Sequence, residues 1–365
     1  MAYVCCCLYS FFLVYFLVGK YQNKAIILTS KALKLILFFP AFYWLLLLGM
    51  QYYVGSDYPT YYKLFETNST GLYQKSFEYS FVFICDFIAK LNLPPQTGFF
   101  IISFVDVLFF CLFLFKYDFE RPDLVLLIYF CCATAFVNQQ NALRQYAAMN
   151  IFLFAFYYVY KRKFFKFLLL ILFASTFHRT AILLIIIYPF AKFLKIENKK
   201  LCIIELLLGV FFCFKGIDSL VVWFVKFTPY AFYLDSDYFL EENRKSFLNI
   251  ATKLIYLPFF IRAIKFKKNF SDKEKFIFHS GICFYSIKLV SMSSFFLGRF
   301  AMYFDVLSYL PLYLYFFYLI KDKAIKKYSK VLELFIFLCV VIGPYLLKTV
   351  ISPAGEYLYQ SILLK

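Results

Sequence analysis

The amino-acid sequence predicts an all-α polytopic membrane protein with about 12 transmembrane helices and two longer outer loops. Of its 365 residues, 63% are hydrophobic and 16% are charged, whereas soluble globular proteins have about 45–50% apolar and about 25% charged residues. One water-soluble core could not cover that much apolar surface. The aromatic content of 24% also excludes a disordered chain.

A transmembrane helix needs about 20 mainly apolar residues, because all its backbone polar groups must be satisfied within it. Twelve apolar segments, several of them short, are assigned as spans of a single transmembrane domain covering residues 1–365. They are residues 2–19, 35–50, 98–115, 122–137, 142–160, 164–177, 180–191, 201–216, 247–263, 276–292, 300–320 and 331–347. No basic residue precedes the first run, which is typical of a retained span and not of a cleaved signal peptide.

The basic residues set the orientation of these spans. Six connecting segments together hold 25 of the 39 lysines and arginines, and the opposite loops and tails hold 12. These six segments are residues 20–34, 116–121, 161–166, 192–200, 262–275 and 321–330. The positive-inside rule assigns them to the cytoplasm and both termini to the outside. Most of the net charge of +18 is therefore a topology signal, and no nucleic-acid partner is needed to explain it.

The segment Phe164–Phe190 allows two topologies. It is either one long span with His178 and Arg179 near the bilayer midplane or two short helices that meet at these two residues. The basic flanks 161–166 and 192–200 should both be cytoplasmic, which favours a hairpin whose tip points outward or into a cavity open to the outside. Charged groups at bilayer depth are stable only where they face protein or water.

The two long loops expected in the periplasm are residues 51–97 and 217–246. The first contains an amphipathic stretch, which predicts a helix lying in the membrane interface rather than a further span. Its apolar residues at helical spacing are Phe77, Phe81, Ile84, Ile88 and Leu91. The second includes Asp235-Ser236-Asp237, a spacing with which metal-dependent glycosyltransferases hold a sugar diphosphate, although such triplets also arise by chance in acidic loops.

Most of the eleven cysteines lie inside apolar runs, and none is in C-x-x-C spacing. This pattern predicts small buried hydrophobic residues, with no metal site and no disulfide framework. Charged side chains within predicted spans suit an ion path, but they are scattered over different spans, so the sequence gives no pairing. They are Asp106, Glu205, Lys288 and Glu333. His279 is expected to be a hydrogen-bonded structural residue.

Three arginines lie at outer ends of predicted spans, against the orientation bias: Arg144, Arg179 and Arg299. The planar guanidinium fork suits phosphate oxygens, so three converging forks would form a pyrophosphate site. The alternative is that each arginine reaches lipid headgroups or caps a helix. His178 lies beside Arg179, whose charge would favour the neutral imidazole that can act as a base, but no carboxylate lies nearby in the sequence to orient it.

Asp57 opens the first outer loop among aromatic residues. A carboxylate that binds sugar hydroxyls beside the stacking rings of Tyr58 and Tyr61 would suit a sugar site. The plainer interpretation is an Asx turn before Pro59.

Four short motifs follow one another along the chain. They are Gly-x-Asp-Tyr-x-x-Tyr at 55–61, Asn-x-x-Arg-Gln-x-x-Ala at 141–148, Ala-x-x-Phe-His at 174–178 and Gly-Arg-x-x-x-Tyr-Phe at 298–304. Their order, their spacing and their positions at outer span ends resemble the EpsG-like group of bacterial Wzy-type polysaccharide (O-antigen) polymerases. The resemblance extends from about residue 50 to 310, and the first and last spans add only hydropathy.

This resemblance implies a fold similar to GT-C glycosyltransferases, in the bacterial inner membrane with the active site facing the periplasm. It implies that the growing glycan is transferred from undecaprenyl pyrophosphate onto a lipid-linked repeat unit. Donor and acceptor are then both undecaprenyl-pyrophosphate-linked oligosaccharides, whose lipid tails lie in apolar grooves between spans. A chain-length regulator would be a further partner, and no cofactor is implied.

Asp57, Arg144, His178 and Arg299 fall on the motifs of this family, whereas Arg179 lies just beyond one. The residues expected to contact substrate are Tyr58, Tyr61, Gln145 and Tyr303. Arg144 and Arg299, helped by Arg179, would bind the leaving pyrophosphate without a metal. His178 is the preferred base for the acceptor hydroxyl, and Asp57 is its rival.

Three rival functions also need many spans: a flippase or transporter of lipid-linked repeat units, an O-antigen ligase and a membrane O-acyltransferase. Loss of a polymerase leaves single repeats on the lipid, whereas loss of a flippase does not. A ligase would use the lipid A core as acceptor. In an acyltransferase, the residues around the catalytic histidine would be expected to form a fuller motif than one Phe-His pair.

Overall fold

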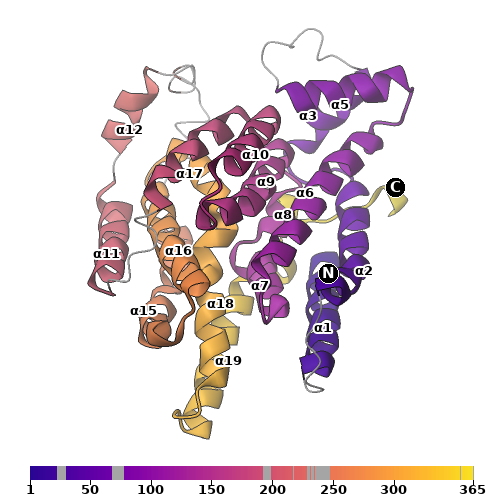
Figure 1. The fold of residues 1–365 in the computed structure, drawn as a ribbon. Helices are drawn as coiled ribbons and strands as arrows, with labels where there is room; N and C mark the ends of the chain where they lie inside the picture. The colour runs from indigo at the N-terminus through magenta and orange to yellow at the C-terminus, as the bar shows by residue number, and fades with distance from the viewer. Residues whose placement is uncertain are drawn as a thin grey trace. The chain divides into compact units, whose positions relative to one another are not determined.

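The computed structural model of the protein describes residues 1–22, 30–67, 78–191, 199–216, 218–227, 231, 234, 247–353 and 355–364. Every regular element in these ranges is a helix, and their one isolated antiparallel bridge joins Gln51 to Ser361 (Figure 1). The predicted all-α class is confirmed. The chain divides into two compact units, Met1–Ala191 with Val341–Lys365, and Lys192–Val340.

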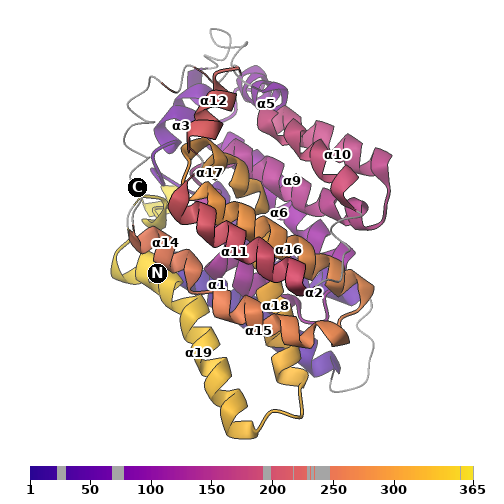
Figure 2. The same ribbon diagram turned by 90° about the vertical axis from the view of Figure 1, so that its left-hand side faces the viewer.

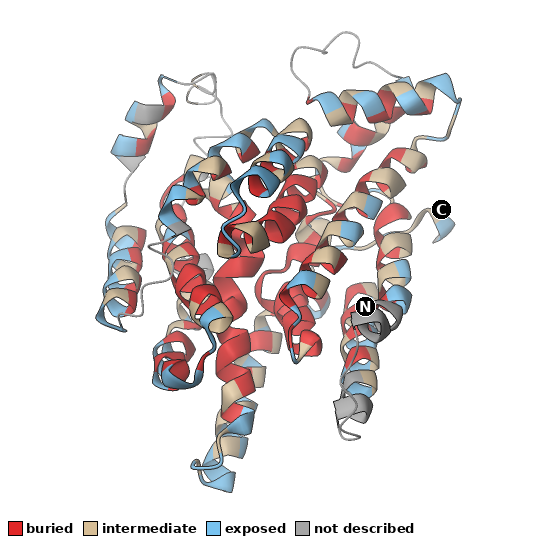
Figure 3. Cartoon of the chain, in the orientation of Figure 1, coloured by how far each residue is buried: buried red, intermediate tan, exposed pale blue. Residues whose placement is uncertain are grey.

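Five apolar helices of the first unit pack against one another in chain order. They are α1 (Ala2–Gln22), α2 (Ser30–Gly49), α6 (Gln96–Tyr117), α9 (Leu143–Tyr160) and α10 (Phe164–Phe177). Contacts run from α1 to α2, from α2 to α6, from α6 to α9 and from α9 to α10. Because neighbours cover it on both sides, α9 is buried along most of its length (Figure 3).

The predicted span 122–137 is not one continuous helix. It consists of α7 (Pro122–Leu127), the π-helical turn η1 (Ile128–Cys132) and the short helix α8 (Ala135–Asn138). Thr134 has a φ of 50°, in the left-handed region that β-branched residues rarely adopt. The chain therefore breaks in a segment whose hydropathy alone predicts a single helix.

The segment after α9 forms a hairpin, the topology that the basic flanks favour. α10 is followed by His178 in extended conformation (φ −151°, ψ 115°), and the 3-10 helix η2 (Arg179–Ile187) packs back against α10. The rings of Tyr188 and Phe164 lie 5.0 Å apart, so the chain returns to the start of α10, where η3 (Pro189–Ala191) follows. The side of the membrane to which its tip points stays a prediction.

The loop 51–97 contains two helices, α3 (Tyr58–Thr67) and α5 (Tyr79–Lys90). Pro59 lies in the first turn of α3, where proline is favoured. α5 is the predicted amphipathic helix, and it packs against α3, α6 and α10. Its buried face is formed by Phe81, Ile84, Cys85 and Ile88, whereas Leu91 is exposed and Phe77 lies outside the described residues.

The described part of the second unit contains eight α-helices. They are α11 (Lys199–Lys215), α12 (Asp218–Val225), α14 (Phe247–Leu254), α15 (Leu257–Phe266), α16 (Asp272–Ser291), α17 (Phe295–Ala301), α18 (Asp305–Lys321) and α19 (Lys327–Leu346), which ends in the first unit. α11 packs against α16, and α16 and α15 pack against α18 (Figure 2). Gly209 permits the first contact, since a Cβ there would lie 2.9 Å from Cα of Ser286.

One predicted span of the second unit is also divided, and another contains a 3-10 turn within a continuous helical stretch. Segment 247–263 contains α14 and α15, separated at Tyr256 with Pro258 in the first turn of α15. Because proline lacks the backbone N–H, a helix begins more readily there than it continues. Segment 300–320 contains the end of α17, the short helix η7 (Met302–Phe304) and α18.

Three described helices are long and apolar enough to cross a bilayer: Gln96–Tyr117, Phe296–Lys321 and Lys327–Ile351, which includes the π-helical turn η8. Other helices are shorter but expose large apolar side chains, such as Phe38 and Phe42 on α2 and Leu207 and Phe211 on α11. Exposed apolar faces of this extent are stable against lipid rather than water. The chain is a membrane protein, and its twelve spans and GT-C-like arrangement stay predictions.

Candidate functional site

The carboxylate of Glu78 joins three groups near the ends of helices. Its Oε2 forms an ion pair with Nη1 of Arg144, and its Oε1 lies 3.2 Å from Nδ1 of His178. The backbone N–H of Arg179 also donates to Oε1, over 3.3 Å. We call Glu78, Arg144, His178 and Arg179 the Glu78 cluster. It brings together two of the predicted arginines and the predicted base, all within the first unit.

Helix ends position the members of this cluster. Glu78 directly precedes α5, Arg144 is the second residue of α9, and His178 directly follows α10. The first N–H groups of a helix have no partner within it, so the amide of Arg179 at the start of η2 can donate to a carboxylate. The positive end of a helix also favours a negative charge there.

Sequence reasoning missed Glu78. This residue lies 66 positions before Arg144 and 100 positions before His178, so no local spacing connects it to either. Its one signal in the sequence is an acidic side chain at the start of an amphipathic stretch. The carboxylate that His178 lacks in its own sequence neighbourhood is thus supplied by the outer loop.

The charge of Glu78 is maintained by its neighbours. Burial raises the pKa of its carboxyl, but the hydrogen bond with His178 and the positive charge of Arg144 outweigh burial and hold the pKa below its usual value. An ionised carboxylate only accepts hydrogen bonds, so His178 carries a proton on Nδ1, and in the neutral imidazole Nε2 then holds the lone pair. The imidazole is therefore oriented in the tautomer that a base requires.

Aromatic rings hold the guanidinium of Arg144. Its Cζ lies 5.2 Å from the ring centre of Phe81 and 5.8 Å from that of Tyr61, and its Nε donates to the Tyr61 hydroxyl over 3.3 Å. The side chains of Arg144 and His178 remain 21% and 25% exposed, whereas that of Glu78 is 7% exposed. The cluster thus has a buried anion and partly open cationic and imidazole groups.

The first two motifs are joined directly. The backbone N–H of Asp57 donates to Oδ1 of Asn141 over 3.0 Å, and the Ser56 hydroxyl lies 3.4 Å from the same oxygen. Gly55 has a φ of 74°, and a Cβ there would lie 2.5 Å from that oxygen, so the close approach requires glycine. Asn141 is three residues before Arg144, so this turn helps to position the start of α9.

The four residues expected to contact substrate are all buried: Tyr58, Tyr61, Gln145 and Tyr303. The ring of Tyr58 stacks on Phe99 at 4.8 Å, and Tyr61 lies edge-on to Phe81 at 5.6 Å. Both rings are buried, and that of Tyr61 lies against the guanidinium of Arg144. Direct contact between these four residues and a glycan stays a prediction.

Arg299 and Tyr303 belong to the second unit. Arg299 is exposed on α17. The rings of Phe300 and Tyr303, which follow it in the sequence, lie 6.1 Å apart. Lys288 and Asp305 form a buried ion pair in the same unit. The predicted convergence of Arg299 with the two arginines of the Glu78 cluster stays a prediction.

The family comparison bears on all four motifs at once. The EpsG family matches residues 34–361, which is most of the chain and includes every motif. The chain belongs to the EpsG family. Membership gives this EpsG protein a polysaccharide polymerase-like role of the glycosyltransferase kind. No curated protein and no solved structure matches the chain.

The acidic residues inside the predicted spans of this EpsG protein have partners from other helices. Asp106 accepts a hydrogen bond from Nδ2 of Asn150 over 2.8 Å, and Glu205 lies 3.0 Å from Nε2 of His279. Glu333 pairs with Arg262 and accepts a hydrogen bond from the Tyr315 hydroxyl. Folding thus supplies the pairs that sequence positions could not reveal. The triplet 235–237 lies outside the described residues.

Proposed function

We propose that this EpsG protein polymerises O-antigen or a related surface polysaccharide at the periplasmic face of the bacterial inner membrane. The growing glycan would leave undecaprenyl pyrophosphate and join the non-reducing end of a lipid-linked repeat unit. The observation that supports this proposal is the Glu78 cluster, in which one buried carboxylate orients a histidine beside two arginines.

His178 would be the base. The acceptor hydroxyl oxygen bonds to C1 of the donor sugar while the bond from C1 to the pyrophosphate oxygen breaks. The hydroxyl proton moves to Nε2 of His178, and the pyrophosphate departs with the bonding electron pair. Glu78 would stabilise the imidazolium that forms, as the carboxylate does in a Ser-His-Asp triad. Asp57, whose backbone holds Asn141, remains the rival base.

The arginines would bind the pyrophosphate. Negative charge builds on the leaving group as the bond breaks, and fixed cations stabilise that charge without reorganisation. Glu78 offsets part of the charge of Arg144, so we assign the exposed Arg179 a larger share of the binding than its place beyond the motif suggests. Arg299 would complete the site, and no metal is required in this mechanism.

The test is a reconstitution with purified protein, undecaprenyl-pyrophosphate repeat units and nothing else. A ladder of glycan lengths on the lipid is the expected product. Absence of a ladder, with repeat units crossing vesicle membranes instead, would identify a flippase. Product that forms only when lipid A core is added would identify a ligase.

A further inference from the structure

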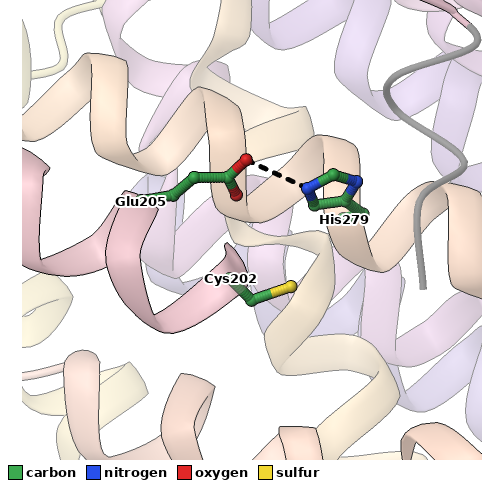
Figure 4. A group of neighbouring side chains, drawn as sticks. All are labelled: Cys202, Glu205 and His279. Carbon is green, nitrogen blue, oxygen red and sulfur yellow. Dashed lines mark hydrogen bonds and ion pairs between the residues drawn. The ribbon is translucent and has the colours of Figure 1, made fainter. Parts of the chain in front are cut away.

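Two helices of the second unit bring four metal-ligating side chains together, none of which belongs to the Glu78 cluster. Cys202 and Glu205 are three residues apart on α11, and His279 and Cys283 are four residues apart on α16, so each pair shares one helix face. The ligand atoms of Cys202, Glu205 and His279 lie within 4.8 Å of one another, and these side chains point toward one another (Figure 4).

Distances to the fourth side chain are equally short. Sγ of Cys283 lies 3.3 Å from Oε1 of Glu205 and 3.9 Å from Nε2 of His279. Around a tetrahedral zinc ion with bonds of about 2.0–2.3 Å, neighbouring ligand atoms are separated by roughly 3.3–3.8 Å. The ligand atoms of Cys202, Glu205 and His279 lie within 4.8 Å of one another, and Cys283 contacts two of these three residues, so side-chain rotations would bring all four around one ion.

We infer that Cys202, Glu205, His279 and Cys283 form a site for a divalent transition metal of the zinc type. Two thiolates, one imidazole and one carboxylate are ligands that Zn²⁺ accepts, whereas Mg²⁺ and Ca²⁺ prefer oxygen alone. Such a site would fasten α11 to α16, which already approach closely at Gly209. The C-x-x-C spacing that sequence reasoning requires is absent because the two helices each supply half of the site.

Lys267 balances the charge of this site. Its side chain is buried, and its Nζ lies 3.9 Å from Sγ of Cys202. With both cysteines deprotonated and Glu205 ionised, the zinc ion and Lys267 make the assembly neutral overall. A neutral assembly avoids the large cost of burying an uncompensated charge.

A second observation concerns the carboxylate itself. Oε2 of Glu205 is buried without a hydrogen-bond partner among the described residues. Buried polar atoms are nearly always satisfied, so an unsatisfied carboxylate oxygen beside two thiols and an imidazole fits a cation site better than a simple hydrogen-bonded cluster.

The test uses the full-length protein, purified in detergent, stripped with a chelator and reloaded with Zn²⁺ or Co²⁺. About one zinc ion per chain should remain after desalting. The cobalt form should show a near-ultraviolet thiolate-to-metal band and strong visible bands of a tetrahedral centre. Cys202→Ser and Cys283→Ser should each weaken the thiolate band, and His279→Ala should lose the metal.

Cys213→Ser is the matched control, because Cys213 is a buried cysteine of α11 outside the four-residue set. It should keep the zinc and the cobalt spectrum. Glu205→Gln retains a hydrogen-bonding side chain beside His279 and should fold, as size-exclusion chromatography would verify, yet bind zinc more weakly. Wild-type protein that holds no more zinc than Cys202→Ser, or a cobalt spectrum without a thiolate band, would overturn the inference.

Discussion

Glu78 gives the site a pH dependence that follows from its contacts. Burial raises the pKa of the Glu78 carboxyl. The hydrogen bond with His178 and the charge of Arg144 lower this pKa by more, so that it lies below the usual value of 4.5. A group whose pKa is lower in the folded state contributes stability above its unfolded pKa, and this contribution disappears as pH falls through the folded pKa. Glu78→Gln should therefore reduce the Tm near pH 7, and this reduction should become smaller as the pH falls toward about 4.

Thermal unfolding of the detergent-purified protein over this pH series measures the effect. Asp86→Asn is the matched control, because Asp86 lies on the same helix, α5, outside the Glu78 cluster. It should leave the Tm nearly unchanged at every pH. A Tm loss in Glu78→Gln that is equal at neutral and acidic pH would show that packing, and not ionisation, is responsible.

His178 carries the second prediction at this scale. His178→Ala should lower the polymerisation rate by about 10²–10⁴-fold, the usual contribution of a positioned base. The remaining rate should rise with pH, because hydroxide must then remove the proton. Initial rates of ladder formation at several pH values measure this. A variant that polymerises at the wild-type rate throughout the series would transfer the base role to Asp57.

Individual site residues can be predicted from the sequence where the residue type is rare. They cannot be predicted where the residue that pairs with them is distant in the sequence. Arg144 stands out because an arginine at an outer span end runs against the orientation bias, and His178 because the chain has two histidines and this one lies at the predicted outer turn. Glu78 was missed because the sequence holds many acidic residues, and only folding brings this one to Arg144. The same limit concealed the pairing of Cys202 with Cys283 across two helices.

Among the elements, the turn before α3 depends on one glycine. Gly55→Ala should destabilise the protein by about 1–3 kcal/mol, because φ is positive there and the new methyl group would contact Asn141. The displaced Asn141 should also shift the start of α9 and reduce polymerisation. The Tm and the ladder assay measure the two effects.

Gly343→Ala is the matched control for this change. Gly343 lies within α19, and no atom approaches within 4 Å of the position of an added Cβ. Alanine in a helix is favoured over glycine, so this variant should be unchanged or stabilised by about 0.5–1 kcal/mol. A Tm loss in Gly343→Ala as large as that in Gly55→Ala would contradict the role of the turn.

The hairpin of α10 and η2 makes a topological prediction. Because the chain reverses at His178, Lys163 and Lys199 should lie on the same side of the membrane, and the basic flanks assign that side to the cytoplasm. Reporter fusions after each lysine should both show cytoplasmic activity. A fusion after His178 serves as the comparison and should show the opposite location. Opposite locations for the two lysines would require a single crossing.

Hydropathy predicted where helices occur better than it predicted their continuity. The spans 98–115 and 142–160 correspond to the continuous helices α6 and α9. In 122–137 and 247–263 the chain breaks at Thr134 and before Pro258. Hydropathy averages over such short breaks, so it does not register them, although Pro258 lacks the backbone N–H that a continuing helix needs.

At the scale of the whole molecule, family membership and the folded contacts provide different information. The EpsG match includes all four motifs, which span both compact units. The contacts within the first unit explain how two of the predicted arginines meet a base. Composition and the long apolar segments predict the membrane class and the charge bias predicts the orientation, but none of these properties describes which helices become neighbours.

The two units also provide the last prediction. Arg144→Ala in the first unit and Arg299→Ala in the second should each abolish long-chain polymer and leave single lipid-linked repeats, because both are proposed to stabilise the same leaving pyrophosphate. Loss of one fixed cation from such a site costs about 10²–10³-fold in rate. Chain-length ladders from membranes with equal protein levels measure the result.

Arg262→Ala distinguishes this role from a general need for arginine. Arg262 is paired with Glu333 on helices of the second unit, in a segment that the charge bias assigns to the cytoplasm, so its loss should leave the ladder intact. If Arg299→Ala retains a normal ladder while Arg144→Ala does not, the pyrophosphate site lies within the first unit alone. Normal ladders from both variants and from Arg179→Ala would exclude the arginine site, because these three residues are the cations assigned to the leaving group.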